Sequence, residues 1–316
     1  MSYHPRMEDP DFGNLITTRC RNSEMWFANN RPVEAAALGY LAKYRQRYGV
    51  KLYAFALEGS HTHKVAVFPN NNRSDFQRDF NSTTARAVTR LTPHHPGGGI
   101  WQRRYSQEFL PDDKDIEEWF FYVALQPILD GLVEKLSEYP FYNFFDDAVW
   151  GIERKFQVVN WEKYHKAKLR NPRVRKRDFT EEFTLKYERL PGYEHLPQKE
   201  YAHLMYDKLE QRRITEIAKR RAKGQGFMGR EALLQVKPGT PARNPKTSTR
   251  TSHRPRVLSV CPERRKKCTS WYFNNHFAYK DCSRRYRAGE LTVEFPPGMY
   301  KPYVKPPPTS PPNQTG

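Results

Sequence analysis

Hydrophobic and polar positions follow regular periods in the first half of the chain. Residues 14–20 are rich in β-branched side chains and predict a short strand. Apolar residues then recur at helical spacing across 32–49, a segment that opens with proline and ends with glycine. Segments 51–58 and 63–68 alternate apolar with polar or small residues around the Gly-Ser pair at 59–60, which predicts a β-hairpin.

The next segments continue this pattern. Ser74 and Gln77 have the spacing of a capping box, which predicts a second helix that ends near Leu91. A glycine-rich connector at 93–99 precedes 100–110, the predicted fourth strand, and a Pro-Asp-Asp sequence then starts a third helix. The order β-α-β-β-α-β with an appended helix predicts an α+β, ferredoxin-like fold, an antiparallel sheet with helices on one face.

The second half differs from the first in composition and in hydrophobic pattern. Residues 149–223 begin with a charged stretch without an apolar face, and 180–223 predicts one or two polar helices packed on the core or on DNA. Residues 224–316 are rich in Pro, Arg and Thr, which predicts a basic, largely disordered tail.

Charge is divided in the same way. The 316 residues carry +19, to which residues 1–150 contribute −2 and residues 151–316 contribute +21. A polycation favours an anionic partner, most often nucleic acid, through counterion release. Basic tails can also serve only to solvate a chain, so charge by itself indicates no chemistry.

Other functional classes are disfavoured by composition. The chain has no run of about 20 apolar residues and no apolar secretory segment at its start, so we expect a soluble, cytoplasmic protein without a membrane span. Four cysteines are too few for a disulfide scaffold. A Cys₃His zinc site is an alternative, but no tight Cys-x₂₋₄-Cys pair is present; its ligands would be Cys261, Cys268, His276 and Cys282.

Two histidines are the first candidates for a reactive site. His61 and His63 stand two apart at the start of a predicted strand, so both imidazoles project from the same face. Two neighbouring imidazoles make half of a metal site. An isolated His-x-His is more often a pair of surface histidines, so the metal hypothesis requires a third ligand.

The appended helix provides one. Tyr122 and Gln126 are one helical turn apart, and Pro127 predicts a kink or an end of the helix there. The amide oxygen of Gln126 is a suitable ligand beside two histidines. Periodicity alone favours another role for Tyr122, packing in the core with the aromatic run at 119–121.

These segments occur in an order that resembles the single-tyrosine HUH transposases, most closely the REP-associated tyrosine transposases. The blocks are a His-x-His strand, a Trp-Gln-x-Arg-aromatic segment and a Tyr-x₃-Asn-Pro-x₃-Gly-Leu-Val segment. They are matched by His61 and His63, by Trp101, Gln102, Arg104 and Tyr105, and by Tyr122, Gln126, Pro127, Gly131, Leu132 and Val133.

The resemblance covers about residues 10–148, which it identifies as the catalytic domain, and nothing after 150 matches. The sequence departs from the family pattern in three places. Thr62 replaces a hydrophobic residue, Gln126 replaces asparagine, and the turn at 58–60 differs.

The resemblance implies cleavage and rejoining of single-stranded DNA through a 5′-phosphotyrosine. Tyr122 would be the nucleophile, and His61, His63 and Gln126 would hold Mg²⁺ or Mn²⁺. The implied DNA is a hairpin end of a mobile or repetitive element, bound by a monomer or homodimer. The basic and aromatic residues of the predicted fourth strand would contact it through Trp101, Arg103, Arg104 and Tyr105.

Two alternatives remain open at this stage. One is a non-catalytic, domesticated nucleic-acid-binding protein on the same scaffold, although Tyr122 and Gln126 are intact. The other is a replication or relaxase nickase, although such enzymes usually lack the Gly-Leu-Val block at 131–133. Tyr105 in the core, with solvated arginines beside it, is the matching alternative to DNA contact.

Overall fold

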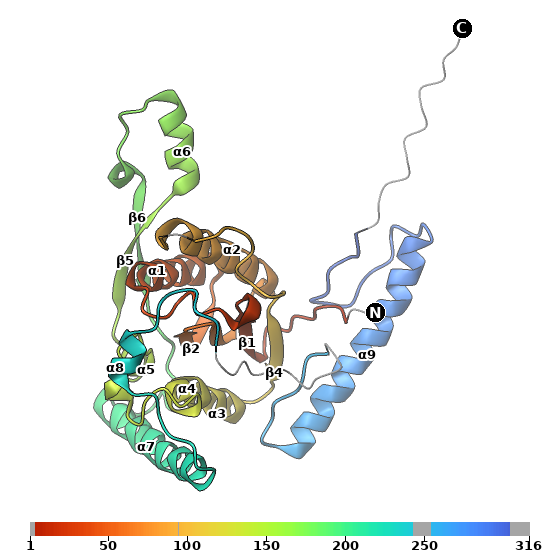
Figure 1. Cartoon of the computed structure of the whole chain (residues 1–316). Helices are drawn as coiled ribbons and strands as arrows, with labels where there is room; N and C mark the ends of the chain where they lie inside the picture. The colour runs from red at the N-terminus through yellow and green to blue at the C-terminus, as the bar shows by residue number, and fades with distance from the viewer. Residues whose placement is uncertain (1–3, 94, 243–253, 304–316) are drawn as a thin grey trace.

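The central unit is a four-stranded antiparallel sheet with the order β2-β3-β1-β4. The computed structural model describes residues 4–93, 95–242 and 254–303 (Figure 1). In chain order the elements of this unit are β1 (Gly13–Arg19), α1 (Arg31–Tyr48), β2 (Lys51–Glu58), β3 (His61–Val67), α2 (Arg73–Leu91), β4 (Ser106–Leu110), α3 (Asp113–Ala124) and α4 (Gln126–Leu129). The predicted ferredoxin-like, α+β fold is confirmed, with the strand order of that fold.

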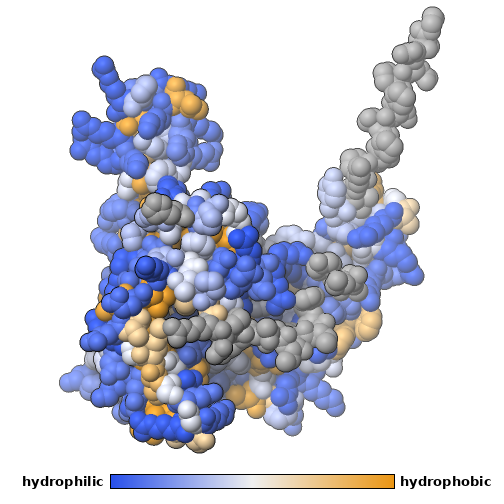
Figure 2. Space-filling model, viewed as in Figure 1, coloured by the Kyte–Doolittle hydropathy of each residue, from blue (hydrophilic) through white to orange (hydrophobic). Residues whose placement is uncertain are grey.

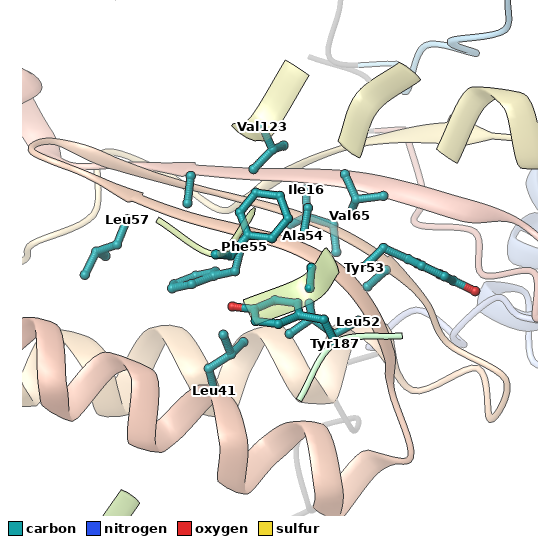
Figure 3. Close-up of a cluster of buried hydrophobic side chains, with 14 of the residues drawn as sticks. Ile16, Leu41, Leu52, Tyr53, Ala54, Phe55, Leu57, Val65, Val123 and Tyr187 are labelled. Atoms are coloured by element: carbon teal, nitrogen blue, oxygen red, sulfur yellow. The ribbon is translucent and has the colours of Figure 1, made fainter. Parts of the chain in front are cut away.

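Helices cover both faces of this sheet. Alternation along β3 directs Lys64 toward Phe80 of α2 and His63 toward Tyr122 of α3. Figure 3 shows Leu41 of α1 below the strands and Val123 of α3 above them. The expectation of helices on one face of the sheet holds for α1 and α2, whereas the appended helix α3 lies on the opposite face. Every residue of β3 is consequently buried.

Helix α2 starts differently from the prediction. Its N-cap is Asn72, and the predicted capping-box bond of Ser74 is replaced by a contact from the N-terminal segment. The carboxylate of Glu8 accepts the backbone N–H groups of Arg73 at 2.7 Å and Ser74 at 3.0 Å. A carboxylate at this end satisfies donors that have no partner in the helix and favours the helix dipole.

The fourth strand is shorter than predicted. It begins at Ser106, and residues 102–104 form a bend that precedes it. Trp101 makes an isolated bridge with Cys20, and Gln102 N–H donates to the carbonyl of Arg19. Arg103, Arg104 and Tyr105 therefore precede β4, because its pairing with β1 begins only at Ser106.

The remaining elements lie outside the central unit, most of them in the second half of the chain. They are the short 3₁₀ helices η1 (Arg21–Ser23), η2 (Leu136–Glu138) and η3 (Lys176–Phe179), together with α5 (Phe145–Trp150), β5 (Arg154–Val159), α6 (Trp161–Arg170), β6 (Thr180–Leu185), α7 (Gln198–Ala222), α8 (Arg230–Leu234) and α9 (Pro262–Arg287). The prediction of helix from residue 180 was wrong for β6, which pairs with β5 in a two-stranded antiparallel sheet. It was right for α7.

Part of the predicted disordered tail has regular structure. Residues 254–260 run along the open edge of β4, where Phe109 N–H donates to the carbonyl of Arg256 and its carbonyl accepts from Leu258. Helix α9 follows, and Trp271 packs edge-on against Phe109, with 5.5 Å between ring centroids. Contacts distant in sequence thus order this segment. The parts of the predicted tail at 243–253 and 304–316 lie outside the described residues.

Within the part of the chain that the structure describes, no helix is both long enough and apolar enough to cross a membrane.

The buried ammonium of Lys64 gives a test of the fold. Burial lowers its pKa from 10.5 to about 7, and it is covered by the rings of Phe80 and Phe55. Between these pKa values unfolding takes up a proton, so the free energy of unfolding should rise with pH by up to about 1.4 kcal/mol per unit. We expect Lys64→Met to lose this rise, measured by urea unfolding between pH 6 and 9.

The exposed Lys51→Met variant, on β2, is the matched control and should retain the rise. Identical pH profiles for wild type and Lys64→Met would contradict a buried, deprotonated amine.

Candidate active site

The candidate histidines lie at the start of β3, on the sheet face that α3 covers. Register pairs His61 with Glu58 of β2 and His63 with Thr17 of β1. The two imidazoles have centroids 4.8 Å apart at 89° to each other. They are 6% and 3% exposed, so neither is the surface histidine of the alternative hypothesis.

Both imidazole rings are hydrogen-bonded through Nδ1. Thr17 Oγ1 is 2.8 Å from His63 Nδ1, and Ser60 Oγ is 3.5 Å from His61 Nδ1. A hydrogen bond that Nδ1 donates fixes the ring orientation and keeps the proton on Nδ1, which is the tautomer in which Nε2 can bind a metal. The threonine that pairs with His63 in the sheet therefore supports it in the site.

Helix α3 brings Tyr122 to the histidines. Its ring lies 5.9 Å from that of His63 and 4.6 Å from that of Trp119, edge-on in both cases. Phe120 and Phe121 are fully buried, whereas Tyr122 is only partly buried. Helical periodicity thus assigns the core to two members of the aromatic run and places Tyr122 at the edge of the core, against His63.

Gln126 occupies the break between two helices. Helix α3 ends at Ala124 and α4 begins at Gln126, next to Pro127, as the proline predicts. Gln126 is 3% exposed, and its Nε2 donates to the carbonyl of Tyr122 at 3.2 Å. This bond occupies the amide nitrogen and leaves the amide oxygen as the atom that can bind a metal.

The structure adds a carboxyl group that sequence reasoning missed. Glu58 is the cross-strand partner of His61 and is 3% exposed. Burial and the nearby charge of Asp130 raise its pKa to about 8, while a hydrogen bond from the Tyr139 hydroxyl at 3.2 Å opposes the shift. Glu58 is thus largely protonated at neutral pH. Its position directly before the hairpin turn was the signal for its place beside His61.

The residues predicted to contact DNA have unequal surroundings. Trp101 is partly buried, and its indole N–H donates to the carbonyl of Asn81 at 2.9 Å. Arg103 and Arg104 are exposed. Tyr105 is 8% exposed and is covered by the Arg6 guanidinium, 3.5 Å from its ring centroid, an arrangement that favours the packing alternative.

The structure does not support the alternative of a zinc site in the described residues. All four cysteines are free thiols. In the described ranges, no three or more His, Cys, Asp or Glu side chains are grouped to hold a metal ion. The candidate site of His61, His63 and Gln126 is not such a group, because its third side chain is an amide.

No protein-family model matches the chain. A curated relative from Haemophilus influenzae, described as a putative REP-associated tyrosine transposase, is 24% identical over 113 residues. That alignment covers 33% of this chain and 64% of the relative, so the chain spans less than two thirds of the relative's length.

Two solved structures share lower similarity. A REP-associated tyrosine transposase bound to a REP hairpin is 20% identical with a TM-score of 0.40, over 48% of this chain and 87% of that one. A putative transposase from Deinococcus radiodurans R1 is 14% identical with a TM-score of 0.28, over 39% and 95%. The family resemblance seen in the motifs is confirmed by the curated relative: the chain is similar to REP-associated tyrosine transposases.

Proposed function

We propose that this chain is a metal-dependent HUH transposase that cleaves and rejoins single-stranded DNA through a 5′-phosphotyrosine. The observation that carries the proposal is the meeting of β3 and the end of α3, where the ring of Tyr122 contacts that of His63 and Gln126 follows one turn later. Transposase similarity of the curated relative supports the same class.

The side chains of His61, His63 and Gln126 are chemically suited to a divalent ion. His63 is hydrogen-bonded at Nδ1, the amide nitrogen of Gln126 is engaged with a backbone carbonyl, and His61 stands beside His63. Two imidazole nitrogens and one amide oxygen are donors that Mn²⁺ or Mg²⁺ accepts, with Mn²⁺ favoured by the imidazoles. When bound, such an ion would polarise a phosphate and stabilise the charge that develops on it.

The chain supplies the nucleophile and its position. The phenol oxygen of Tyr122 would attack phosphorus, forming one P–O bond as the bond to the 3′-oxygen breaks. The phenol proton is balanced by the proton that the released 3′-hydroxyl gains. Trp119 packs edge-on against the ring and restricts its orientation toward the histidines. Attack by a second 3′-hydroxyl on the phosphotyrosine would rejoin strands and regenerate Tyr122.

The direct test is a covalent-adduct assay. The full chain is incubated with single-stranded oligonucleotides that contain a hairpin, with and without Mn²⁺, and resolved on a denaturing gel. A slow-migrating protein–DNA band that requires Mn²⁺ supports the proposal. Hairpin binding without any adduct would instead support the non-catalytic alternative.

We expect Tyr122→Phe to abolish the adduct and to change DNA affinity by less than about threefold, because only the phenol oxygen is removed and the ring contacts remain. The gel assay and a filter-binding titration measure the two effects. Tyr48→Phe is the control: Tyr48 lies on α1, its phenol donates a hydrogen bond to Asp79 of α2, and this variant should retain the adduct. An adduct formed by Tyr122→Phe would exclude Tyr122 as the nucleophile.

We expect Thr17→Val to weaken Mn²⁺ binding by roughly 10- to 100-fold, because it removes the hydroxyl that orients His63 but keeps a similar side-chain shape. Calorimetric titration with Mn²⁺ measures the effect. Thr18→Val is a matched control, since Thr18 is adjacent, buried and near Asn81 of α2 on the other sheet face. Equal Mn²⁺ affinity in both variants would argue against His63 as a ligand.

A further inference from the structure

The two-stranded sheet of β5 and β6 carries α6 and η3 at its far end, in an arm that stands away from the central sheet (Figure 1). Six-residue strands span roughly 20 Å. We call residues 161–179 the arm tip. It has eight Lys or Arg residues against Glu162 and Asp178, a net charge of +6. All eight cations are exposed, and Figure 2 shows this lobe as mostly hydrophilic.

Acidic neighbours compensate only some of these cations. Lys163, Lys166 and Arg177 lie within 4.0 Å of a carboxylate. The other five have no ion pair with any acidic side chain among the described residues. They are Lys168, Arg170, Arg173, Arg175 and Lys176. The arm tip thus presents a set of uncompensated positive charges to solvent.

The aromatic side chains of the arm tip are used internally. Tyr164 is buried and packs edge-on against Trp161 at 5.9 Å and Phe179 at 5.8 Å. The guanidinium of Arg90, at the end of α2, covers Trp161 at 3.9 Å from the ring centroid. Proteins that bind single strands combine cations with aromatic faces open to bases. Here the rings of Trp161, Tyr164 and Phe179 are engaged and His165 is the exposed one, so the surface offers mainly phosphate contacts.

We propose that the arm tip binds the sugar-phosphate backbone of double-stranded DNA, independently of sequence. The inference rests on the proposed function only in taking DNA as the anionic partner. Cations with few base-stacking groups match a duplex, in which the bases are enclosed and the phosphates are displayed in two rows. The arm would therefore grip a paired segment, while Tyr122 and the histidines act on an unpaired strand.

The base of the arm supports such a role because it is fixed to the core. A Cβ at Gly39 of α1 would lie 2.9 Å from Val158 of β5, so glycine permits close packing there. Lys43 lies over the ring of Phe183 in β6 at 5.5 Å. The arm therefore rests on α1, which covers the sheet face opposite the one that bears His63. Binding of the duplex and cleavage of the single strand would thus take place on opposite sides of the central sheet.

The experiment neutralises three uncompensated cations together, in the full chain: Arg170→Gln, Arg173→Gln and Arg175→Gln. Affinity is measured for a 20-base-pair duplex of arbitrary sequence and for a 20-nucleotide single strand, across a salt series. We expect duplex affinity to fall at least about tenfold and the duplex salt slope to decrease by about 0.9 for each phosphate that the variant no longer neutralises. Single-strand affinity should change by less than about threefold.

A variant with equal charge loss controls for net charge. Arg78→Gln, Lys219→Gln and Arg284→Gln remove exposed cations that are already paired with carboxylates, and should leave duplex affinity within about threefold. Equal losses in both triple variants, or equal losses for duplex and single strand, would overturn the proposal.

The covalent-adduct assay separates this inference from the proposed function. The arm variant should still form the adduct on a single-stranded substrate at saturating concentration. If wild type forms no adduct but the arm variant alone loses duplex affinity, the proposed function fails and the arm inference stands.

Discussion

The register of β3 between β1 and β2 is the constraint on which the site depends. Because both faces of this strand are buried, each residue has a fixed side: His61 and His63 face α3, and Lys64 faces Phe55 and Phe80. A slip by one residue would exchange the two sets and place an ammonium beside Tyr122. Thr17 reinforces the observed register, since its hydroxyl bonds His63 only when the two residues are paired.

Two features at the end of α3 complete the candidate site: the burial of two phenylalanines and the break of the helix at a proline. Phe120 and Phe121 must enter the core, which fixes the rotation of the helix and leaves Tyr122 at the core's edge. Pro127 cannot continue the helix, so the chain turns into α4 directly after Tyr122 has been positioned. Gln126 sits at this turn, and its bond to the carbonyl of Tyr122 ties the candidate ligand to the candidate nucleophile.

Local signals predicted the parts of this arrangement that are set by local chemistry. The strands and helices up to α3 follow from period, proline and glycine, and the shared face of the histidines follows from strand alternation. Contacts between distant segments were not predictable in this way. Glu8 caps α2 from 65 residues away, and Glu58 becomes a protonated neighbour of His61 only through burial that the folded hairpin and Tyr139 create. Helix α9 lies within the segment that its Pro, Arg and Thr content predicts to be largely disordered, whereas Trp271 and Tyr272 anchor the helix beside β4.

Folding also redistributes the positive charge that the sequence assigns to the second half. Cations of α7 pair with acids of the first half: Lys208 with Glu117 at 2.6 Å and Arg212 with Glu118 at 2.7 Å. The two glutamates in the middle of α3 thus bind α7 and neutralise part of its charge. The formal net charge of the second half is therefore larger than the positive charge that is available to a polyanion such as DNA. Because counterion release depends on cations available to phosphates, DNA affinity should follow exposed, uncompensated groups such as those of the arm tip, and not the formal charge of the whole segment.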